Sequence, residues 1–329
     1  ARDRRARNAR PVADEHRALS GTDGAGGDYV PPAYLVDQWV RLARAGRVVA
    51  DQVTHQPLPA GTDTINLPRM VTGTATAAQA SQNTAIQQTD ATTDTIAANV
   101  ETIAGGQTLS LQLVEQSPVA VDDLVLGDLL ADLAVKVDTF TINNNAAGKR
   151  GMINVTGVNS ITYTDATPTV GELYAKIADA VQQIHTGRFL PPSKIFMHPR
   201  RWAWLLAALD TQTRPLVVPV AQMPQNAIAA MGGVAAEGLV GSLQGLPVFV
   251  DPNLPTNLGA GTNEDRIVVT RAEDVILYES LPRAEVFREV LAAQMSIFVR
   301  VYEYAAIHAG RYPKSISVIS GTGLVAPTF

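Results

Sequence analysis

The sequence of 329 residues contains no cysteine, few aromatic residues and few charged residues. The absence of cysteine excludes disulfide bonds, thiolate nucleophiles and zinc–sulfur centres, and it is compatible with assembly in a reducing cytoplasm. Charged residues make up 17% of the chain and aromatic residues 5%. Globular domains usually carry about a quarter charged residues, so the scarcity of charge predicts that neighbouring molecules cover much of the surface.

The distribution of charged and apolar residues argues against nucleic-acid-binding, membrane-spanning and secreted proteins. The formal net charge of −5 argues against a general nucleic-acid binder, which would show a strongly basic domain. No run of about 18 apolar residues occurs, so no membrane span is expected. The basic start ARDRRARNAR is followed by no hydrophobic region, so it is not a secretory signal. With 46% hydrophobic residues the chain can bury a sizeable core, and its length predicts two or three domains or one elaborate domain.

Gly148 and Lys149, within the stretch TFTINNNAAGKRGMINV, invite a phosphate-binding interpretation. A phosphate loop needs an earlier glycine, a serine or threonine after the lysine, and a helix that begins after the loop. Here Arg150 follows the lysine, and the loop comes after a predicted helix. Asparagines tolerate left-handed backbone and basic side chains suit a helix C-terminus, so the stretch predicts a turn between two structural elements.

No other catalytic or metal-binding pattern is present. Ser242 in VGSLQG lacks the flanking residues of a nucleophile elbow. The five histidines are scattered, and His198 is interpreted as a buried histidine at the end of a strand. The aspartates of a predicted long helix lack the Glu-x-x-His of di-metal bundles, so we interpret their side as solvated or facing a partner. They are Asp122, Asp123, Asp128, Asp132 and Asp138. The sequence therefore predicts no enzyme, no cofactor and no metal.

The N-terminal part combines a basic cluster with a short helix. Residues 2–10 carry five arginines and one aspartate, which suits contact with nucleic acid and equally suits an arm lying on a neighbouring subunit. Residues 21–32 are glycine-rich and predict a flexible stretch. Apolar residues at helical spacing then predict a helix that ends at Gly46. Two short strands are predicted next, within residues 48–58 and 63–70.

Residues 71–99 consist mainly of threonine, alanine and glutamine, with no aromatic residue, lysine or arginine. Such a segment cannot form a core of its own, and its β-branched threonines favour extended structure. We therefore predict a long two-stranded arm that protrudes and is stabilised by a partner. A disordered linker is the alternative interpretation.

A long amphipathic helix is predicted after a strand at residues 102–116. Ser117 is a suitable cap, Pro118 suits the first helical position, and two aspartates lie near the positive end of the helix dipole. Apolar residues recur at helical spacing along the segment up to Asn144. They are Leu126, Leu130, Leu133, Val137 and Phe140.

The remaining chain predicts a compact α/β region followed by a long β finish. Helices are predicted at residues 169–187 and 199–210, strands at 193–199, 245–255, 266–270 and 274–280, loops at 214–244, and long strand-like runs over 286–320. No internal repeat with a fixed period is present.

The order of these parts resembles the major capsid protein of tailed bacteriophages, which has the Hong Kong 97 phage fold. The resemblance extends over about residues 26–323. GGDYVPPAYLVDQWV resembles the family's start after its flexible arm, and DTINLPRM resembles the entry to its extended loop. VAVDDLVLGDLLADLAVKVDTFTINN is similar to its spine helix. SKIFMHPRRWAWLLAALD and GSLQGLPVFVDPNLP are similar to elements of its axial domain.

The resemblance implies an α+β fold with an N-terminal arm, an extended β-hairpin loop, a peripheral domain with a spine helix and a long β-sheet, and a compact α/β axial domain. The implied segments are the N-terminal arm with a short helix (1–47), first peripheral strands (48–65), extended loop (66–104), peripheral domain with the spine helix (105–150), axial domain (151–283) and C-terminal peripheral strands (284–329).

The resemblance also implies a function and partners. Subunits would form hexamers and pentamers that tile an icosahedral virion head around double-stranded DNA, which they contact weakly and non-specifically. Assembly would take place in the host bacterial cytoplasm, without a membrane. A cement or decoration protein, a portal, a scaffold and a maturation protease are further implied partners. The expected assembly contacts are Arg69, Thr72, Gln87, Asp128 and Asp132.

Two departures from the family pattern carry predictions. The turn after the spine helix keeps only Gly151 before an apolar pair. The founding member of the fold joins a lysine of its extended loop to an asparagine of another subunit. This chain has five lysines, the first of which is Lys136, so we predict no such covalent link. The sequence starts at Ala1, which we expect to reflect either a cut by a maturation protease or an uncut short arm.

Two rival functions remain at this stage. An encapsulin-type compartment shell would share the fold but enclose cargo enzymes, and it typically begins with a cargo-binding helix instead of a long flexible arm. A soluble α/β enzyme is more remote, because no nucleophile or ligand constellation is visible.

Overall fold

The computed structural model describes residues 42–117, 120–209, 213, 215–219, 229–231, 238–289 and 292–328. The basic cluster, the glycine-rich stretch and most of the first predicted helix lie outside these residues. The predicted end of that helix at Gly46 is wrong, because residues 42–48 have no regular structure. A four-residue helix, α1 (Val49–Gln52), begins only after them, and its Ala50 N–H donates to the Asp138 carboxylate.

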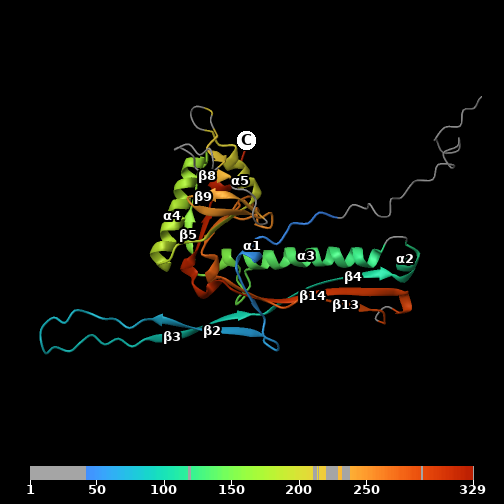
Figure 1. Ribbon diagram of the computed structural model, residues 1–329, viewed down its shortest axis with the longest axis horizontal. Coiled ribbons are helices and arrows are strands. Elements are labelled where there is room, and N and C mark those ends of the chain that lie inside the picture. Colours follow the sequence, from blue (N-terminus) through green and yellow to red (C-terminus); the bar gives the residue numbers. More distant parts are fainter. Residues whose placement is uncertain are drawn as a thin grey trace, which may run out of the picture. The chain divides into compact units, whose positions relative to one another are not determined.

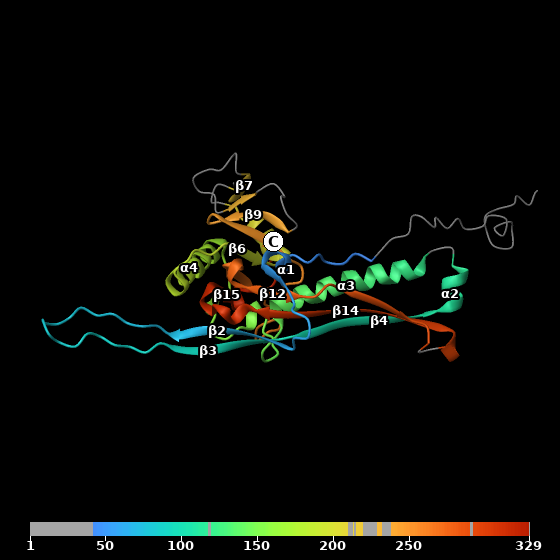
Figure 2. The same ribbon diagram turned by 60° about the horizontal axis from the view of Figure 1, so that its bottom comes forward.

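A five-stranded sheet is built around the long strand β14 (Ser296–His308). On one side β14 pairs antiparallel with β4 (Glu101–Ser110). On the other it pairs with β12 (Ile276–Glu279) and β13 (Arg283–Phe287), and β1 (Thr54–Pro57) lies parallel to β12. The helix α3 (Val121–Asn143), which we call the spine helix, runs along β4 and β14 in Figures 1 and 2.

A second sheet has eight strands in the order β5-β15-β11-β6-β10-β9-β8-β7. The helix α4 (Val170–Arg188) packs on β5, β11 and β15, and the short helix α5 (Pro199–Leu206) follows β6. The strands are β5 (Asn159–Thr162), β6 (Lys194–Met197), β7 (Val217–Pro219), β8 (Ala229–Met231), β9 (Leu239–Leu243), β10 (Leu246–Val250), β11 (Ile267–Thr270) and β15 (Ile316–Ser320).

The predicted two-stranded arm is confirmed as a hairpin. Strand β2 (Thr64–Thr72) pairs antiparallel with β3 (Thr92–Asn99), and Figure 1 shows the hairpin projecting beyond the sheets. The connecting residues 73–91, which we call the arm tip, contain no strand and a turn at 81–83.

Single turns of 3-10 helix join several strands. They are η2 (Met152–Asn154), η4 (Ala272–Asp274), η5 (Ala292–Gln294), η6 (Ala309–Arg311), η7 (Pro313–Ser315) and η8 (Thr322–Leu324).

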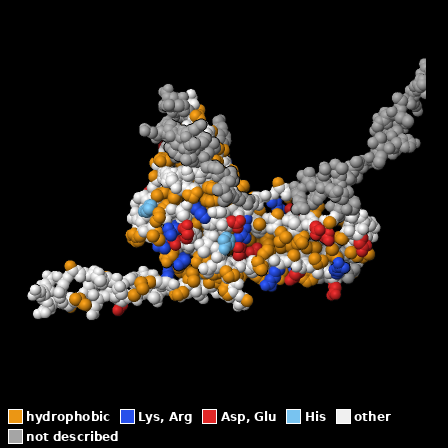
Figure 3. Space-filling model, in the orientation of Figure 1, with side chains coloured by type: hydrophobic (Ala, Val, Ile, Leu, Met, Phe, Trp, Pro, Cys, Tyr) orange, Lys and Arg blue, Asp and Glu red, His pale blue; other side chains and the backbone are white. Residues whose placement is uncertain are grey.

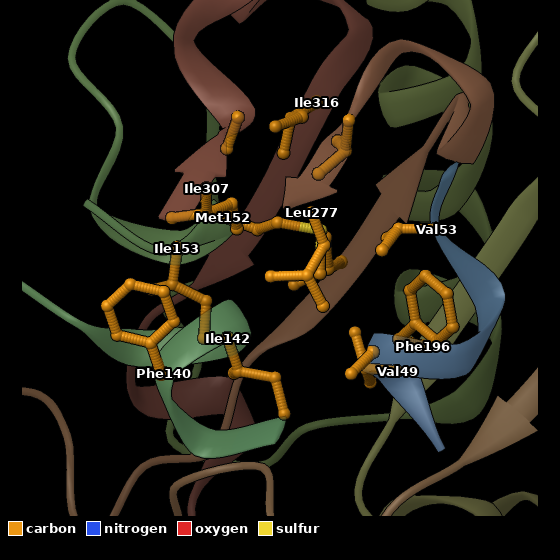
Figure 4. Packing of buried hydrophobic residues seen from close by; sticks show 14 of the residues in the cluster. Val49, Val53, Phe140, Ile142, Met152, Ile153, Phe196, Leu277, Ile307 and Ile316 are labelled. Carbon is orange, nitrogen blue, oxygen red and sulfur yellow. The ribbon is translucent and has the colours of Figure 1, made fainter. Parts of the chain in front are cut away.

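The largest buried cluster lies where the two sheets meet the end of the spine helix. Figure 4 shows Phe140 of α3 beside Ile153, and Ile142 of α3 on the side of Val49 of α1. Phe196 of β6 and Leu277 of β12 belong to the same cluster. Full burial of one such side chain contributes roughly 1.5–3 kcal/mol, so this cluster fixes the spine helix, α1 and both sheets in one unit.

Several predicted elements have different limits in the structure. The strand predicted at residues 102–116 ends at Ser110, and residues 111–116 form the helix α2 (Leu111–Gln116). Its pairing partner β14 begins at Ser296, opposite Ser110, so no strand is available beyond that point. The predicted loops at 214–244 contain β7, β8 and β9, because mutual pairing supplies hydrogen bonds that a Gly- and Ala-rich sequence does not signal.

The start of the spine helix also differs from the prediction. The helix begins at Val121, Ala120 is its N-cap without a side-chain hydrogen bond, and Ser117 instead ends α2. Its buried face is concentrated in the second half, from Leu133 to Ile142, whereas Leu130 is exposed. The helix is therefore most deeply buried at its C-terminal end, while Val125 in its first half packs against Leu109, Ile297 and Val299.

Two strands do not follow the expected division between the axial domain (151–283) and the C-terminal peripheral strands (284–329). Strand β12 precedes that division but pairs with β14 in the five-stranded sheet. Strand β15 follows it but pairs with β5 and β11 in the eight-stranded sheet. The apolar sequence of each strand predicts burial but does not specify the partner.

Candidate functional site

The described residues contain no group of three or more His, Asp or Glu side chains that could hold a metal ion. His198 directly follows β6, close to the predicted place, but it is half-buried instead of buried. Its Nδ1 accepts a hydrogen bond of 3.1 Å from Arg200 N as the cap of α5. Burial, followed by the charge of Arg200, lowers its pKa. His198 therefore has a structural explanation at the start of a helix.

Within the described part of the chain, no helix is both long enough and apolar enough to span a bilayer.

The loop around Lys149 is a turn that fastens the end of the spine helix to the base of the arm. Gly148 adopts a positive φ of 75°, and its carbonyl accepts a hydrogen bond of 2.9 Å from Asn99 N. Lys149 Nζ lies 2.5 Å from Glu101 Oε2. The lysine therefore neutralises a carboxylate of its own chain, which agrees with the predicted turn and leaves the phosphate-loop interpretation without support.

Gly151 closes this turn by close packing. Its N–H donates to Asn144 O over 2.8 Å. A Cβ at this position would lie 2.7 Å from the Ile142 carbonyl carbon and 2.8 Å from the Asn143 and Asn144 nitrogens. Only glycine fits so near backbone atoms, so the one glycine that the turn shares with the capsid family has a steric reason.

The arm holds itself together by contacts across its two strands. Arg69 pairs with Asp94 over 3.1 Å, and the hydroxyl oxygens of Thr72 and Thr92 lie 2.5 Å apart. These contacts are exposed to water and salt, so each contributes little to stability. Arg69 and Thr72, which the sequence suggests as assembly contacts, thus stabilise the hairpin of their own chain, and their role between subunits stays a prediction.

The arm tip has no core. Every residue from 73 to 91 is exposed, and Ile86 is 71% exposed. The Gln87 side chain bonds only within the tip, to Gln88 O and Thr89 Oγ1. Figure 3 shows the arm almost free of charged side chains. An exposed segment with little charge is suited to contact with a partner, and coverage by a partner stays a prediction.

Asp128 and Asp132 of the spine helix hold an arginine of the same chain. Arg44 donates from Nε and Nη2 to the two carboxylate oxygens of Asp128, each over 2.7 Å, and from Nη1 to Asp132 Oδ1 over 2.7 Å. The hydrogen bond from Arg44 lowers the pKa of Asp128. The two aspartates lie one helical turn apart, so together they fix residues 42–47 along the spine helix. Their expected contact with another subunit stays a prediction.

Asp138 departs from the interpretation given to the helix aspartates. It is fully buried, not solvated or facing a partner, and it lies beside Asp251 at the turn after β10. The second half of the spine helix is buried on several sides, so a polar residue there meets the core. The position of Asp138 next to Val137 in the apolar stripe is the one sequence signal that could have indicated this.

A surface groove of 870 Å³ lies at the base of the arm. Leu67 and Ile96 of the arm, Tyr278 of β12 and Arg311 are among the residues that line it. It contains no catalytic constellation, and its position beside the arm makes it part of the candidate assembly surface.

Known proteins resemble this chain both in sequence pattern and in fold. The model of the phage capsid family matches residues 26–319. No curated protein has a sequence that matches this chain. Solved structures match over most of their length: a chain of Gordonia phage Cozz is 14% identical, with 91% of this chain and 94% of that chain covered and a TM-score of 0.66. A chain of Mycobacterium phage Ogopogo is 13% identical, with 90% of this chain and 98% of that chain covered and a TM-score of 0.68.

A third similar structure comes from the capsid of an empty GTA particle. It is 14% identical, with 92% of this chain and 98% of that chain covered and a TM-score of 0.69. At such identities these structures establish the mixed α+β fold alone. The family match covers most of the chain, and its family is structural and not enzymatic. The protein therefore belongs to the phage capsid family and is a major capsid protein, a component of the virion head shell.

Proposed function

We propose that this chain assembles into hexamers and pentamers that tile an icosahedral head around double-stranded DNA, held together without covalent links from the arm. The observation that carries the proposal is the arm tip, whose residues 73–91 are all exposed and form no core. An exposed segment without a core of its own gains stability when another molecule covers it.

The two sheets support distinct roles in such a shell. The eight-stranded sheet with α4 and α5 corresponds to the axial domain, which would surround the axis of each capsomer. The five-stranded sheet with the spine helix corresponds to the peripheral domain, which would meet neighbouring capsomers. The net charge of −5 supports only weak, non-specific contact with DNA.

Electron microscopy of the full-length chain after expression tests the assembly. Icosahedral particles or isolated hexamers and pentamers are expected, and size-exclusion chromatography should give particles or capsomers. A chain that remains a dispersed monomer at every concentration would refute the proposal.

The lysine positions support a shell without isopeptide links from the arm. No lysine precedes Lys136, so the arm contains none. Lys149 lies at the arm's base, where Glu101 holds its ammonium group. Lys194 donates to the backbone oxygen and to the side chain of Gln52, over 2.7 and 2.9 Å. Noncovalent contacts or a separate cement protein would therefore stabilise the shell.

Denaturing gel electrophoresis of boiled particles tests this part of the proposal. A single band at the 34.9 kDa of one chain is expected. A ladder of multimers that resists boiling would refute the absence of covalent links while leaving the assembly itself intact.

A further inference from the structure

Two carboxyl groups are completely buried side by side where the spine helix meets the eight-stranded sheet. Asp138 of α3 and Asp251, the residue after β10, are both 0% exposed. Neither forms an ion pair with any described residue. Buried carboxylates are normally paired with a cation or a metal, so this pair calls for another explanation.

Hydrogen-bond donors from two other segments surround the pair. Ala50 N donates to Asp138 Oδ1 over 2.6 Å, and Asn253 Nδ2 donates to Asp138 Oδ2 over 2.8 Å. Asn253 N donates to Asp251 Oδ1 over 2.8 Å, and the Val49 backbone also donates to Asp251. The remaining oxygen, Asp251 Oδ2, is buried and has no donor among the described residues.

This arrangement identifies where a proton resides. Two adjacent carboxylates in a buried site without a cation cannot both ionise near neutral pH. Both Asp138 oxygens already accept hydrogen bonds, whereas Asp251 Oδ2 accepts none. Asp251 Oδ2 is therefore the position for an O–H that donates to Asp138. Burial, then the hydrogen bond to Asp138 and its charge, raise the pKa of Asp251 to about 8.

We propose that Asp138 and Asp251 share one proton and form a latch that holds residues 46–50 against the spine helix and opens when this proton is lost. Asn253 extends the latch, because its Nδ2 also donates to Gly46 O over 2.9 Å. The latch thus joins α1, the end of α3 and the turn after β10. It does not depend on the hexamers and pentamers proposed above.

The other charged groups of α1 and of the elements packed on it lie outside the hydrogen bonds of the carboxyl pair. On α1 and just before it, Arg47 pairs with Asp51 over 2.7 Å and with Glu279 over 2.8 Å. From β6, Lys194 binds Gln52. On α3, Lys136 is exposed and takes no part in the hydrogen bonds of the carboxyl pair. None of these cations contacts the carboxyl pair.

Two further groups near the latch have shifted pKa values. His198 follows Met197, whose carbonyl accepts from Asp251 N over 3.1 Å, and burial lowers the pKa of His198. On β14, burial and then the charge of Glu279 raise the pKa of Glu303 to about 7. Substitutions of these two residues provide the controls.

The direction of the pH effect follows from the raised pKa. The latch is at full strength below the pKa of an unfolded aspartate, about 4, weakens as pH rises above it, and is lost as pH rises through about 8. Across this window the equilibrium for local opening changes by up to tenfold per pH unit. Between pH 5.5 and 7.5 we therefore expect an increase of about a hundredfold in opening.

Hydrogen exchange at residues 46–53 of the full-length protein measures this opening, because the amides of Val49 and Ala50 donate to the pair. The wild type is compared with D251N in one assembly state at each pH, so that the chemical dependence of exchange on pH cancels. The side-chain amide that D251N introduces can replace the O–H donor to Asp138. D251N should therefore remain protected at all pH values, and the wild type should lose protection relative to it as pH rises. Equal pH responses in the two proteins would overturn the proposal.

The second variant, D138N, tests which group carries the proton. An amide at residue 138 turns an NH₂ group toward Ala50 N or Asn253 Nδ2, so D138N should lose protection at every pH. D138N behaving like D251N would overturn the assignment. The controls E303Q and H198Q should keep the pH response of the wild type, and loss of that response in either would also count against the latch.

A direct measurement of the proton does not require D251N to fold. In the E303Q background, infrared difference spectra should show a carboxylic-acid C=O band at pH 6 that disappears above about pH 8. Absence of this band at pH 6 would refute the shared proton.

Discussion

Replacing the arm tip tests whether the hairpin serves the fold of its own chain or the assembly. In the designed variant, the two residues Asn-Gly replace residues 73–91 and connect Thr72 to Thr92. These two threonines are paired in register and their hydroxyl groups are in contact, so a two-residue turn can close the hairpin there.

The structure predicts that this change does not weaken the fold. Every residue of the arm tip is exposed, so the deletion removes no buried contact of the chain itself. The new connection is roughly tenfold shorter, which lowers the entropy cost of closing the hairpin by about 2 kcal/mol in the simple loop model. The free energy of unfolding of the unassembled chain should therefore be unchanged or raised by up to about 2 kcal/mol. Particle formation should be lost.

Urea unfolding, followed by circular dichroism at one protein concentration, measures the stability, and electron microscopy measures assembly. The matched control replaces residues 73–91 by a Gly/Ser linker of the same length, which keeps the reach of the arm but removes its side chains. Normal particles from both variants would refute an assembly role for the arm tip. A destabilised unassembled chain would show that the arm supports its own subunit.

The remaining predictions concern buried groups. R201M should lower the free energy of unfolding by about 2–4 kcal/mol in urea unfolding, because Arg201 forms a buried ion pair of 2.7 Å with Asp265. The double variant R201M/D265N should lose less stability than the two single variants combined. G151A should cost about 1–3 kcal/mol in the same assay, because its Cβ meets backbone atoms that no rotamer change can move, and an unchanged midpoint would contradict this. The pKa of Glu303 is raised to about 7, so the contribution of this residue to stability is lost as pH rises through that value. E303Q should therefore be more stable than the wild type at pH 8, by about 1–3 kcal/mol. In thermal scans this difference should vanish near pH 4.

The sequence by itself determined the elements whose signals are local. The helix α4 begins at Val170, after the N-cap Thr169 that forms a capping box with Glu172, and α5 begins at Pro199. Residues within one turn of each other create these signals, so neighbouring sequence suffices to recognise them. The arm was predictable for a related reason, since residues 71–99 contain too few large apolar side chains to form a core.

The tertiary structure alone decided which distant segments meet. The apolar strands β12 and β15 look alike in sequence, and their assignment to different sheets follows from their pairing with β14 and with β11. Lys149 is distant in sequence from Glu101 and pairs with it at the base of the arm. Such contacts depend on long loop closures and on the competition between alternative strand partners, which short-range periodicity does not encode.

Tertiary packing also decided the environments of the aspartates on the spine helix. The sequence favoured a helix side that is solvated or faces a partner, yet Asp128 and Asp132 bind Arg44 while Asp138 is buried beside Asp251. The difference arises because other elements enclose the C-terminal half of the spine helix, whereas its N-terminal half packs by one face on β4 and β14. Helical periodicity tells which residues share a face, but only the packing of other elements on that helix decides how far along it the core extends.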